Sequence, residues 1–279
     1  MTALSTALAK AKADGRAALI GYLPVGYPSV DVSIAAMRAM VEGGADVVEV
    51  GVPYSDPVMD GPVIQAAADR AVRAGVGIAD ALRAVTAVSQ AGAAAVVMTY
   101  WNPIERYGVE AFAADLAGAG GAGLITPDLI PDEADAWLAA ADQHALDRVF
   151  LVAPSSTDKR LAMTAEHCRG FVYATAVMGV TGSRDQTSEA APRLVSRTRA
   201  VTDLPVGVGL GVSSGDQAAA VAAYADGVIV GSALVRRLLD APDLRSGVRA
   251  VAALTSDLAV GVRRRGTGTP QRSEVLDRS

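Results

Sequence analysis

Eight short apolar runs, each separated from the next by a stretch of helical composition, constrain the fold of this chain more than any other feature. Most of the runs are apolar at consecutive positions, which is the pattern of parallel strands covered by helices. The runs occupy residues 17–23, 46–50, 94–99, 122–125, 148–152, 171–174, 205–208 and 227–230. The helical stretches between them include residues 30–42, 78–89, 110–117, 132–144, 190–201 and 215–223.

This alternation predicts an α/β protein with a parallel sheet, and eight repeats in 279 residues favour closure into a (β/α)8 barrel, the TIM barrel. We expect one domain over residues 1–262, with an additional N-terminal helix and a short phosphate-binding helix after strand 8. Residues 263–279 show no apolar period, so we expect a disordered C-terminal tail. A doubly wound open sheet is the alternative, but no G-x-G-x-x-G fingerprint supports it.

Composition and charge restrict the partners and the location of the chain. The net charge is −5 and the sequence has no basic face with interleaved aromatic residues, so we expect no nucleic-acid partner. The uncharged stretch 84–104 contains Asn102 and Pro103 and is interpreted as a helix end followed by a strand, so we expect no membrane contact. No signal peptide is evident and Cys168, expected to be buried, is the only cysteine, which favours a cytoplasmic location.

An acidic residue near the end of the second apolar run marks the first candidate for chemistry. Glu49 interrupts that run, and a carboxyl there is either paired structurally or held in a partly desolvated pocket with a raised pKa. The loop that follows contains Asp56 and Asp60 among prolines and glycines. Either aspartate could cap the next helix, which is the usual role of an aspartate in that place. The alternative is that Glu49 and a loop aspartate face one cavity as an acid–base pair.

Three glycine-bearing strand ends late in the chain indicate an anion site. They are the segments 179–182, 209–211 and 231–232, and the last opens a short helix. Backbone N–H groups at helix N-termini attract anions, and the loops after the last two strands of a TIM barrel commonly bind phosphate. Tight turns alone would also explain any one of these glycines.

The residues that the chain lacks narrow the reaction. None of its three lysines lies in a predicted strand, where a Schiff-base lysine would be desolvated, and no His/Cys/Asp spacing fits a zinc site. We therefore expect no metal and no imine electron sink. If the site breaks a carbon–carbon bond, the substrate must accept the electrons itself.

Segment 49–65, EVGVPYSDPVMDGPVIQ, resembles the signature of the tryptophan synthase α subunit family, and the resemblance extends to about residue 260. Further matching segments are LPVGYPS at 23–29, MTYWNP at 98–103, LITPDLIPDE at 124–133, APSST at 153–157, GFVYATAVMGVTGSR at 170–184, VGLGVSSGDQ at 208–217 and VIVGSALV at 228–235.

The resemblance implies a lyase of tryptophan biosynthesis that cleaves indole-3-glycerol phosphate to indole and glyceraldehyde 3-phosphate, with the indole ring as electron sink. By motif, Glu49 corresponds to the family's proton-transfer acid and Asp60 to the carboxylate that takes or stabilises the indole N–H proton. Asp56 and Pro57 fall in the loop that faces the partner subunit. The implied substrate-binding residues are Tyr22, Tyr100, Tyr173, Thr181, Gly182, Leu210, Gly211, Gly231 and Ser232.

The resemblance also implies a partner, a β subunit that carries pyridoxal phosphate, in an α2β2 complex. We expect no cofactor in this chain itself. Two alternatives stay open: a stand-alone indole-glycerol-phosphate lyase, and a catalytically silent barrel that binds a phosphate ligand only to regulate a partner. The presence of both Glu49 and Asp60 argues against silence.

Several positions depart from the commoner pattern of the family. Tyr27 stands where Gly-Asp-Pro is usual, Val58-Met59 replaces Leu-Ala, Ala122 replaces an acid and Leu210 replaces a phenylalanine. None of these changes removes a proton-transfer or phosphate-binding group. They bear on loop closure and on the shape of the indole pocket.

Overall fold

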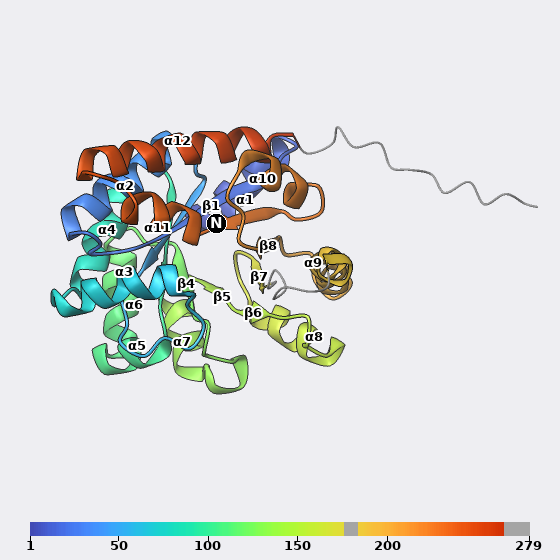
Figure 1. The fold of residues 1–279 in the computed structure, drawn as a ribbon. Coiled ribbons are helices and arrows are strands. Elements are labelled where there is room, and N and C mark those ends of the chain that lie inside the picture. Colours follow the sequence, from blue (N-terminus) through green and yellow to red (C-terminus); the bar gives the residue numbers. More distant parts are fainter. Residues whose placement is uncertain (176–183, 265–279) are drawn as a thin grey trace, which may run out of the picture.

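The computed structural model describes residues 1–175 and 184–264, and within them the strands form a barrel surrounded by helices (Figure 1). The nine parallel strands follow the order β5-β4-β3-β2-β1-β9-β8-β7-β6. The two edge strands, β5 and β6, are separated in sequence only by Phe150, so the chain itself connects the two ends of this strand order. The predicted TIM barrel is confirmed. The strands are β1 (Ala18–Pro24), β2 (Val47–Gly51), β3 (Ala94–Met98), β4 (Gly123–Ile125), β5 (Asp147–Val149), β6 (Leu151–Val152), β7 (Val172–Thr175), β8 (Val206–Gly209) and β9 (Gly227–Val230).

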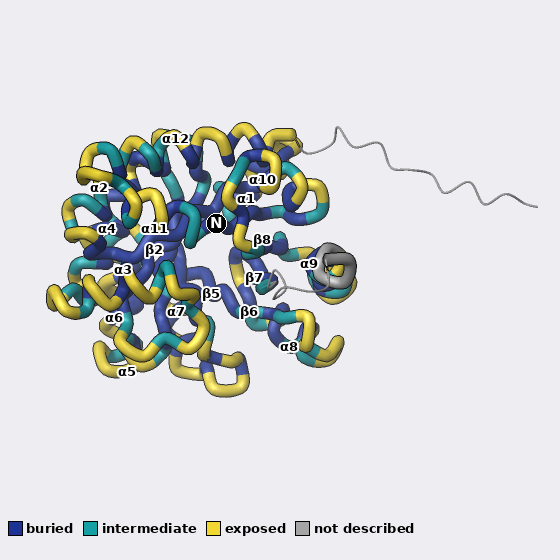
Figure 2. The backbone as a smooth tube through the Cα atoms, viewed as in Figure 1, coloured by how far each residue is buried: buried dark blue, intermediate teal, exposed yellow. Residues whose placement is uncertain are grey.

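Helices follow the strands and cover the outside of the barrel, and their outward faces are exposed while the strands are buried (Figure 2). The helices are α1 (Ala3–Ala13), α2 (Val30–Glu42), α3 (Pro62–Arg73), α4 (Ile78–Gln90), α5 (Trp101–Tyr107), α6 (Val109–Gly118), the 3-10 turn η1 (Pro131–Glu133), α7 (Asp135–Gln143), α8 (Asp158–His167), α9 (Arg184–Arg199), α10 (Gly215–Ala222), α11 (Ser232–Leu239) and α12 (Leu244–Val262).

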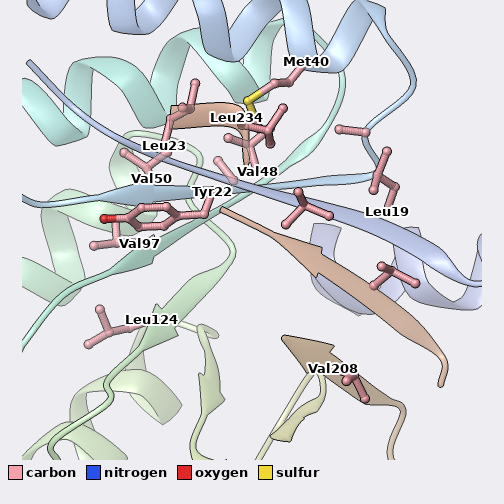
Figure 3. Packing of buried hydrophobic residues seen from close by; sticks show 14 of the residues in the cluster. Leu19, Tyr22, Leu23, Met40, Val48, Val50, Val97, Leu124, Val208 and Leu234 are labelled. Carbon is pink, nitrogen blue, oxygen red and sulfur yellow. The ribbon is translucent and has the colours of Figure 1, made fainter. Parts of the chain in front are cut away.

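The hydrophobic core has two layers, one on each side of the strands. Outward-facing strand residues such as Val48 and Val50 pack with helix residues such as Met40 and Leu234 (Figure 3). Inward-facing residues fill the barrel itself, and Leu4 of α1 packs with them, so α1 closes one end of the barrel. The predicted additional N-terminal helix therefore has a structural role. Burial on both faces explains why the strands are apolar at consecutive positions.

Alternation along the strands directs particular side chains into the barrel. Val47 belongs to the inner layer, so Glu49, two residues further along β2, faces the same way. In the register of the sheet Glu49 lies between Tyr22 of β1 and Val96 of β3. The acid that interrupts the second apolar run is thus placed inside the barrel near its C-terminal end.

Most predicted elements agree with the structure within about two residues, which is the usual uncertainty in where an element ends. The strand predicted at 148–152 is interrupted at Phe150. The helix predicted at 132–144 is divided at Ala134 into η1 and α7. Helix α9 begins at Arg184 and not at residue 190. Of the predicted tail, residues 265–279 lie outside the described residues.

Candidate active site

A cavity of about 250 Å³ opens at the C-terminal ends of the strands, where the active sites of TIM barrels lie. It brings together residues from β1, β2, β3, β7, β8 and β9 with the loops and helix termini that follow. The lining residues are Tyr22, Glu49, Met59, Asp60, Gly61, Ile64, Met98, Tyr173, Thr175, Gly209, Leu210, Gly211, Ile229, Gly231 and Ser232.

Glu49 is the most unusual group in this cavity. Its side chain is 1% exposed, and its Oε1 atom is buried without a hydrogen-bond partner among the described residues. Burial alone raises the pKa of the carboxyl from its ordinary value of 4.5 to about 8, because a charged carboxylate loses its hydration there. Of the two alternatives for Glu49, the structure therefore favours the desolvated carboxyl over the ion pair.

Asp60 does not cap the helix that follows it. The N-cap residue of α3 is Gly61, which has no side-chain cap, and the Asp60 Oδ1 atom instead accepts a hydrogen bond of 3.2 Å from the Tyr100 hydroxyl. Burial raises the pKa of Asp60, while the Tyr100 hydrogen bond acts in the opposite direction. Asp60 and Glu49 line the same cavity, as expected for an acid–base pair.

Two tyrosines of the predicted set line the cavity as neutral phenols. Burial raises the pKa of Tyr22 and of Tyr173 well above the ordinary value, and the nearby carboxyl groups add to the effect. The Tyr22 hydroxyl lies over Gly51, where an added Cβ would be 2.6 Å from it. A residue larger than glycine at that position would displace the ring. Gly51 thus makes room for Tyr22.

Tyr100 was predicted as a substrate-binding residue, but it is not among the residues that line the described cavity. Its side chain is 3% exposed, and its hydroxyl contacts Asp60 and the Met59 N–H group, which do line the cavity. The structure therefore places Tyr100 behind Asp60. Tyr100 thus contacts a residue of the cavity wall without itself belonging to that wall.

The predicted anion site is assembled from two strand ends. Gly211 follows β8 with a φ of 68°, a conformation that favours glycine. Gly231 is the N-cap of α11, and Ser232 is the first residue of that helix. All three residues line the cavity with Glu49, which places a helix N-terminus beside the candidate acid. Thr181 and Gly182 lie outside the described residues.

The loop between β2 and α3 presents the predicted partner-facing residues to solvent. Asp56 is exposed and accepts a hydrogen bond of 2.5 Å from the Ser55 hydroxyl, and Pro57 is half-buried. The next two residues, Val58 and Met59, are 76% and 51% exposed. Apolar side chains that are exposed at consecutive positions, as these two are, are typical of a surface that a partner covers.

Of the four departures from the family pattern, two lie in or beside the cavity. Leu210 lines it, as does Met59 of the Val58-Met59 pair. Tyr27 lies on the β1–α2 loop, and its hydroxyl accepts a hydrogen bond of 3.2 Å from Arg70 of α3. Ala122 lies in the inner layer of the barrel, where an acid would be desolvated.

Sequence reasoning missed several residues of the cavity wall. Met98, Thr175 and Ile229 lie at or near the ends of β3, β7 and β9 and line the cavity with the predicted residues. Their position at strand ends was the available signal, but nothing in their chemistry separates them from core residues. Cys168 is buried, as predicted.

Other kinds of site are not found among the described residues. No group of three or more histidine, cysteine and acidic residues there is placed to hold a metal ion. No helix in residues 1–175 and 184–264 is long and apolar enough to span a membrane.

The cavity combines a buried carboxyl, a second carboxylate and an anion-attracting helix N-terminus. These features define the class: a TIM-barrel enzyme with an acid–base site for a phosphorylated small molecule.

Comparison with known proteins gives the family. The pattern of the tryptophan synthase alpha chain family matches residues 8–263. The tryptophan synthase alpha chain of Salinispora arenicola is 67% identical over 263 residues, which cover 94% of this chain and 98% of the relative. That of Thermobifida fusca is 62% identical over 266 residues, covering 94% of this chain and 98% of the relative.

Solved structures agree with the sequence relatives. A structure of Mycobacterium tuberculosis tryptophan synthase superposes with a TM-score of 0.87 at 62% identity, covering 94% of this chain and 98% of that chain. The tryptophan synthase subunit alpha of Legionella pneumophila superposes with a TM-score of 0.85 at 32% identity. The match covers 94% of this chain and 98% of that chain. The chain belongs to the tryptophan synthase alpha chain family.

The burial of Glu49 makes folding stability depend on pH. A carboxyl whose pKa is 4.5 when unfolded and about 8 when folded binds its proton more tightly in the folded state, so stability falls as pH rises through that range. We expect Glu49→Gln to stabilise the fold by on the order of 2 kcal/mol at about pH 9 and to change it little at about pH 4.

Urea unfolding of parent and variant at both pH values measures the effect. The matched control is Glu105→Gln, the same chemical change at an exposed position. An equal response of Glu49→Gln and Glu105→Gln at the higher pH would contradict the desolvated state of Glu49.

The anion site predicts a strong effect of added charge at the start of α11. Ser232→Asp should weaken the inhibition by glycerol phosphate about tenfold or more, because it puts a negative charge beside the bound anion. Ser246→Asp, the same change in the first turn of α12 and outside the cavity lining, serves as control. Unchanged inhibition of Ser232→Asp would place the phosphate elsewhere.

Proposed function

We propose that this chain cleaves indole-3-glycerol phosphate to indole and glyceraldehyde 3-phosphate, as the α subunit of tryptophan synthase in tryptophan biosynthesis. The observation that carries the proposal is the buried Glu49 carboxyl, unpartnered at Oε1, in one cavity with Asp60 and the N-terminus of α11. The family of the chain supports the same reaction.

The state of Glu49 suits the first proton transfer. With a pKa of about 8, this carboxyl carries its proton in most molecules at neutral pH, so it can donate a proton to C3 of the indole ring. Asp60 takes or stabilises the N–H proton of the ring. The Tyr100 hydroxyl favours the charged form of Asp60 by donating a hydrogen bond to it. Two carboxyl groups with different environments can thus divide the acid and base roles.

The bond cleavage then needs no electron sink from the protein. Glu49, now a carboxylate, removes the proton of the glycerol hydroxyl next to the ring. The carbon–carbon bond breaks, its electron pair returns to the protonated indole ring, and the hydroxyl carbon becomes the aldehyde of glyceraldehyde 3-phosphate. Asp60 returns the N–H proton, so both carboxyl groups end in their starting states.

The part of the cavity wall at the start of α11 would hold the phosphate. Gly211, Gly231 and the first turn of α11 can offer backbone N–H groups, and a helix N-terminus stabilises an anion. With the phosphate fixed there, the indole ring would lie near Glu49, Asp60 and the apolar Leu210. Positioning of this kind contributes much of the rate in reactions between bound groups.

The proposal includes a β subunit partner in an α2β2 complex, with pyridoxal phosphate in the partner and no cofactor in this chain. The exposed residues Asp56, Val58 and Met59, with half-buried Pro57, support a partner surface on the β2–α3 loop. That loop also contains Asp60, so binding of the partner can act directly on a catalytic group. A cytoplasmic location stays a prediction.

The decisive experiment is an indole-release assay on the purified chain, alone and with a matching β subunit. We expect slow release by the isolated chain and a large rise with the partner. Glu49→Gln and Asp60→Asn should lower the rate by about 10²–10⁴-fold, as loss of a positioned acid or base does. Asp56→Asn, the same change as Asp60→Asn a few residues earlier, should keep the basal rate.

Each outcome separates the alternatives. Full activity without a response to a partner that binds would support the stand-alone lyase. Binding of glycerol phosphate with no indole release under any condition would support the silent regulatory barrel. Near-normal turnover by Glu49→Gln would overturn the assignment of the acid.

A further inference from the structure

One tyrosine hydroxyl holds the catalytic end of the β2–α3 loop. The Tyr100 hydroxyl donates a hydrogen bond of 3.2 Å to Asp60 Oδ1 and accepts one of 3.0 Å from the backbone N–H of Met59. It therefore fixes two consecutive residues, one by its side chain and one by its backbone. With 3% exposure and no place in the cavity wall, Tyr100 acts from behind Asp60.

The backbone on both sides of Tyr100 is itself anchored. On one side the Thr99 N–H donates to the Ile125 carbonyl at 3.1 Å. On the other side the Trp101 N–H, at the start of α5, donates to both oxygens of Asp128 at 2.9 and 3.1 Å. Tyr100 is the N-cap residue of α5, and both anchors belong to the end of β4 and the loop that follows it. A fixed backbone makes its hydroxyl a fixed point for Asp60.

The start of the same loop rests on the same anchor. The ring of Tyr54 packs on the ring of Tyr100 with centroids 5.3 Å apart at a tilt of 33°. The Tyr54 hydroxyl accepts a hydrogen bond of 3.1 Å from the amide of Asn102. Residues 55–58 therefore run between two attachment points, Tyr54 and Met59, that both contact the start of α5.

We propose that Tyr100 is a positioning residue, which directs the Asp60 carboxylate into the cavity, favours its charged form and receives the contact of Tyr54. This role rests on the proposed function, because it concerns the carboxylate that acts on the indole N–H group. A change in the segment 55–58 would reach Asp60 through the Tyr54–Tyr100 ring pair as well as along the chain.

Loss of the Tyr100 hydroxyl has a defined effect on the titration of the site. The titratable groups around Asp60 are Tyr100 from the start of α5, Tyr22 from β1 and Glu49 from β2. Among the described residues, the Tyr100 hydrogen bond is the one interaction that lowers the pKa of Asp60. Without it that pKa rises, so the acid limb of the rate profile, where Asp60 loses its charge, moves to higher pH. The alkaline limb, where Glu49 loses its proton, should stay.

The test compares kcat and KM for indole release over pH in the parent, Tyr100→Phe and Tyr107→Phe. Tyr107 also lies on α5 and donates to a carboxylate, that of Asp115, but it is 40% exposed and outside the cavity lining. For Tyr100→Phe we expect kcat at neutral pH to fall about tenfold, KM to change less than about twofold and the acid limb alone to move up. Tyr107→Phe should match the parent.

A double-mutant cycle tests the Tyr54 contact. Tyr54→Ala should move the acid limb upward in the parent and should not move it further in Tyr100→Phe, because it acts through the Tyr100 ring and hydroxyl. Equal shifts in both backgrounds would overturn the contact as the route from Tyr54 to Asp60.

The remaining outcomes are also decisive. If both limbs of the Tyr100→Phe rate profile lie at the same pH as in the parent, Tyr100 is only a packing residue and the proposal is overturned. This holds whether kcat is normal or lowered. That result leaves the proposed function intact, since the parent is active. Absence of indole release from the parent and from Tyr107→Phe, with and without the partner, would instead overturn the proposed function and with it this inference.

Discussion

The arrangement of the site depends on the burial of one carboxyl group. Glu49 extends from β2, which lies between β1 and β3, into the interior of the parallel barrel, where its Oε1 atom has no hydrogen-bond partner among the described residues. A charged carboxylate in that position is costly, so the group keeps its proton at neutral pH. The barrel supports this state, because apolar strands and covering helices exclude water from its walls. The same burial that makes the charged form of Glu49 unfavourable keeps the group protonated and able to donate a proton at neutral pH.

The loop after Glu49 has an exposed part and a part that lies in the cavity. Asp56 and Val58 belong to the exposed part, and Asp60, two residues before α3, lines the cavity. Two contacts attach this loop to the start of α5. The Tyr100 hydroxyl donates a hydrogen bond to Asp60, and the Tyr54 ring of the loop packs on the Tyr100 ring. The end of β3 thus positions the cavity part of a loop whose other part stays exposed.

The sequence predicts the barrel well, because strands buried on both faces and helices between them leave a clear pattern. Glu49, Asp60, Gly211, Gly231 and Ser232, which the family resemblance groups in one site, line one cavity of the structure, and their roles stay predictions. Where sequence reasoning fails, the cause is that side-chain partners are not local. Asp60 resembles a helix cap in sequence, but Gly61 is the cap and Tyr100, 40 residues away, is the partner of Asp60. Met98 resembles a core residue, and only the barrel geometry places it in the cavity wall.

The central claim is that Glu49 is a desolvated proton donor, and its titration tests this directly. NMR of the protein with ¹³C-labelled glutamate carboxyl groups, with Glu49→Gln used to assign the signal, gives the pKa of this one group. We expect a midpoint at about 8. A midpoint near 4.5, the ordinary value for a glutamate, would contradict it, because Glu49 would then be charged at neutral pH and unable to donate the proton.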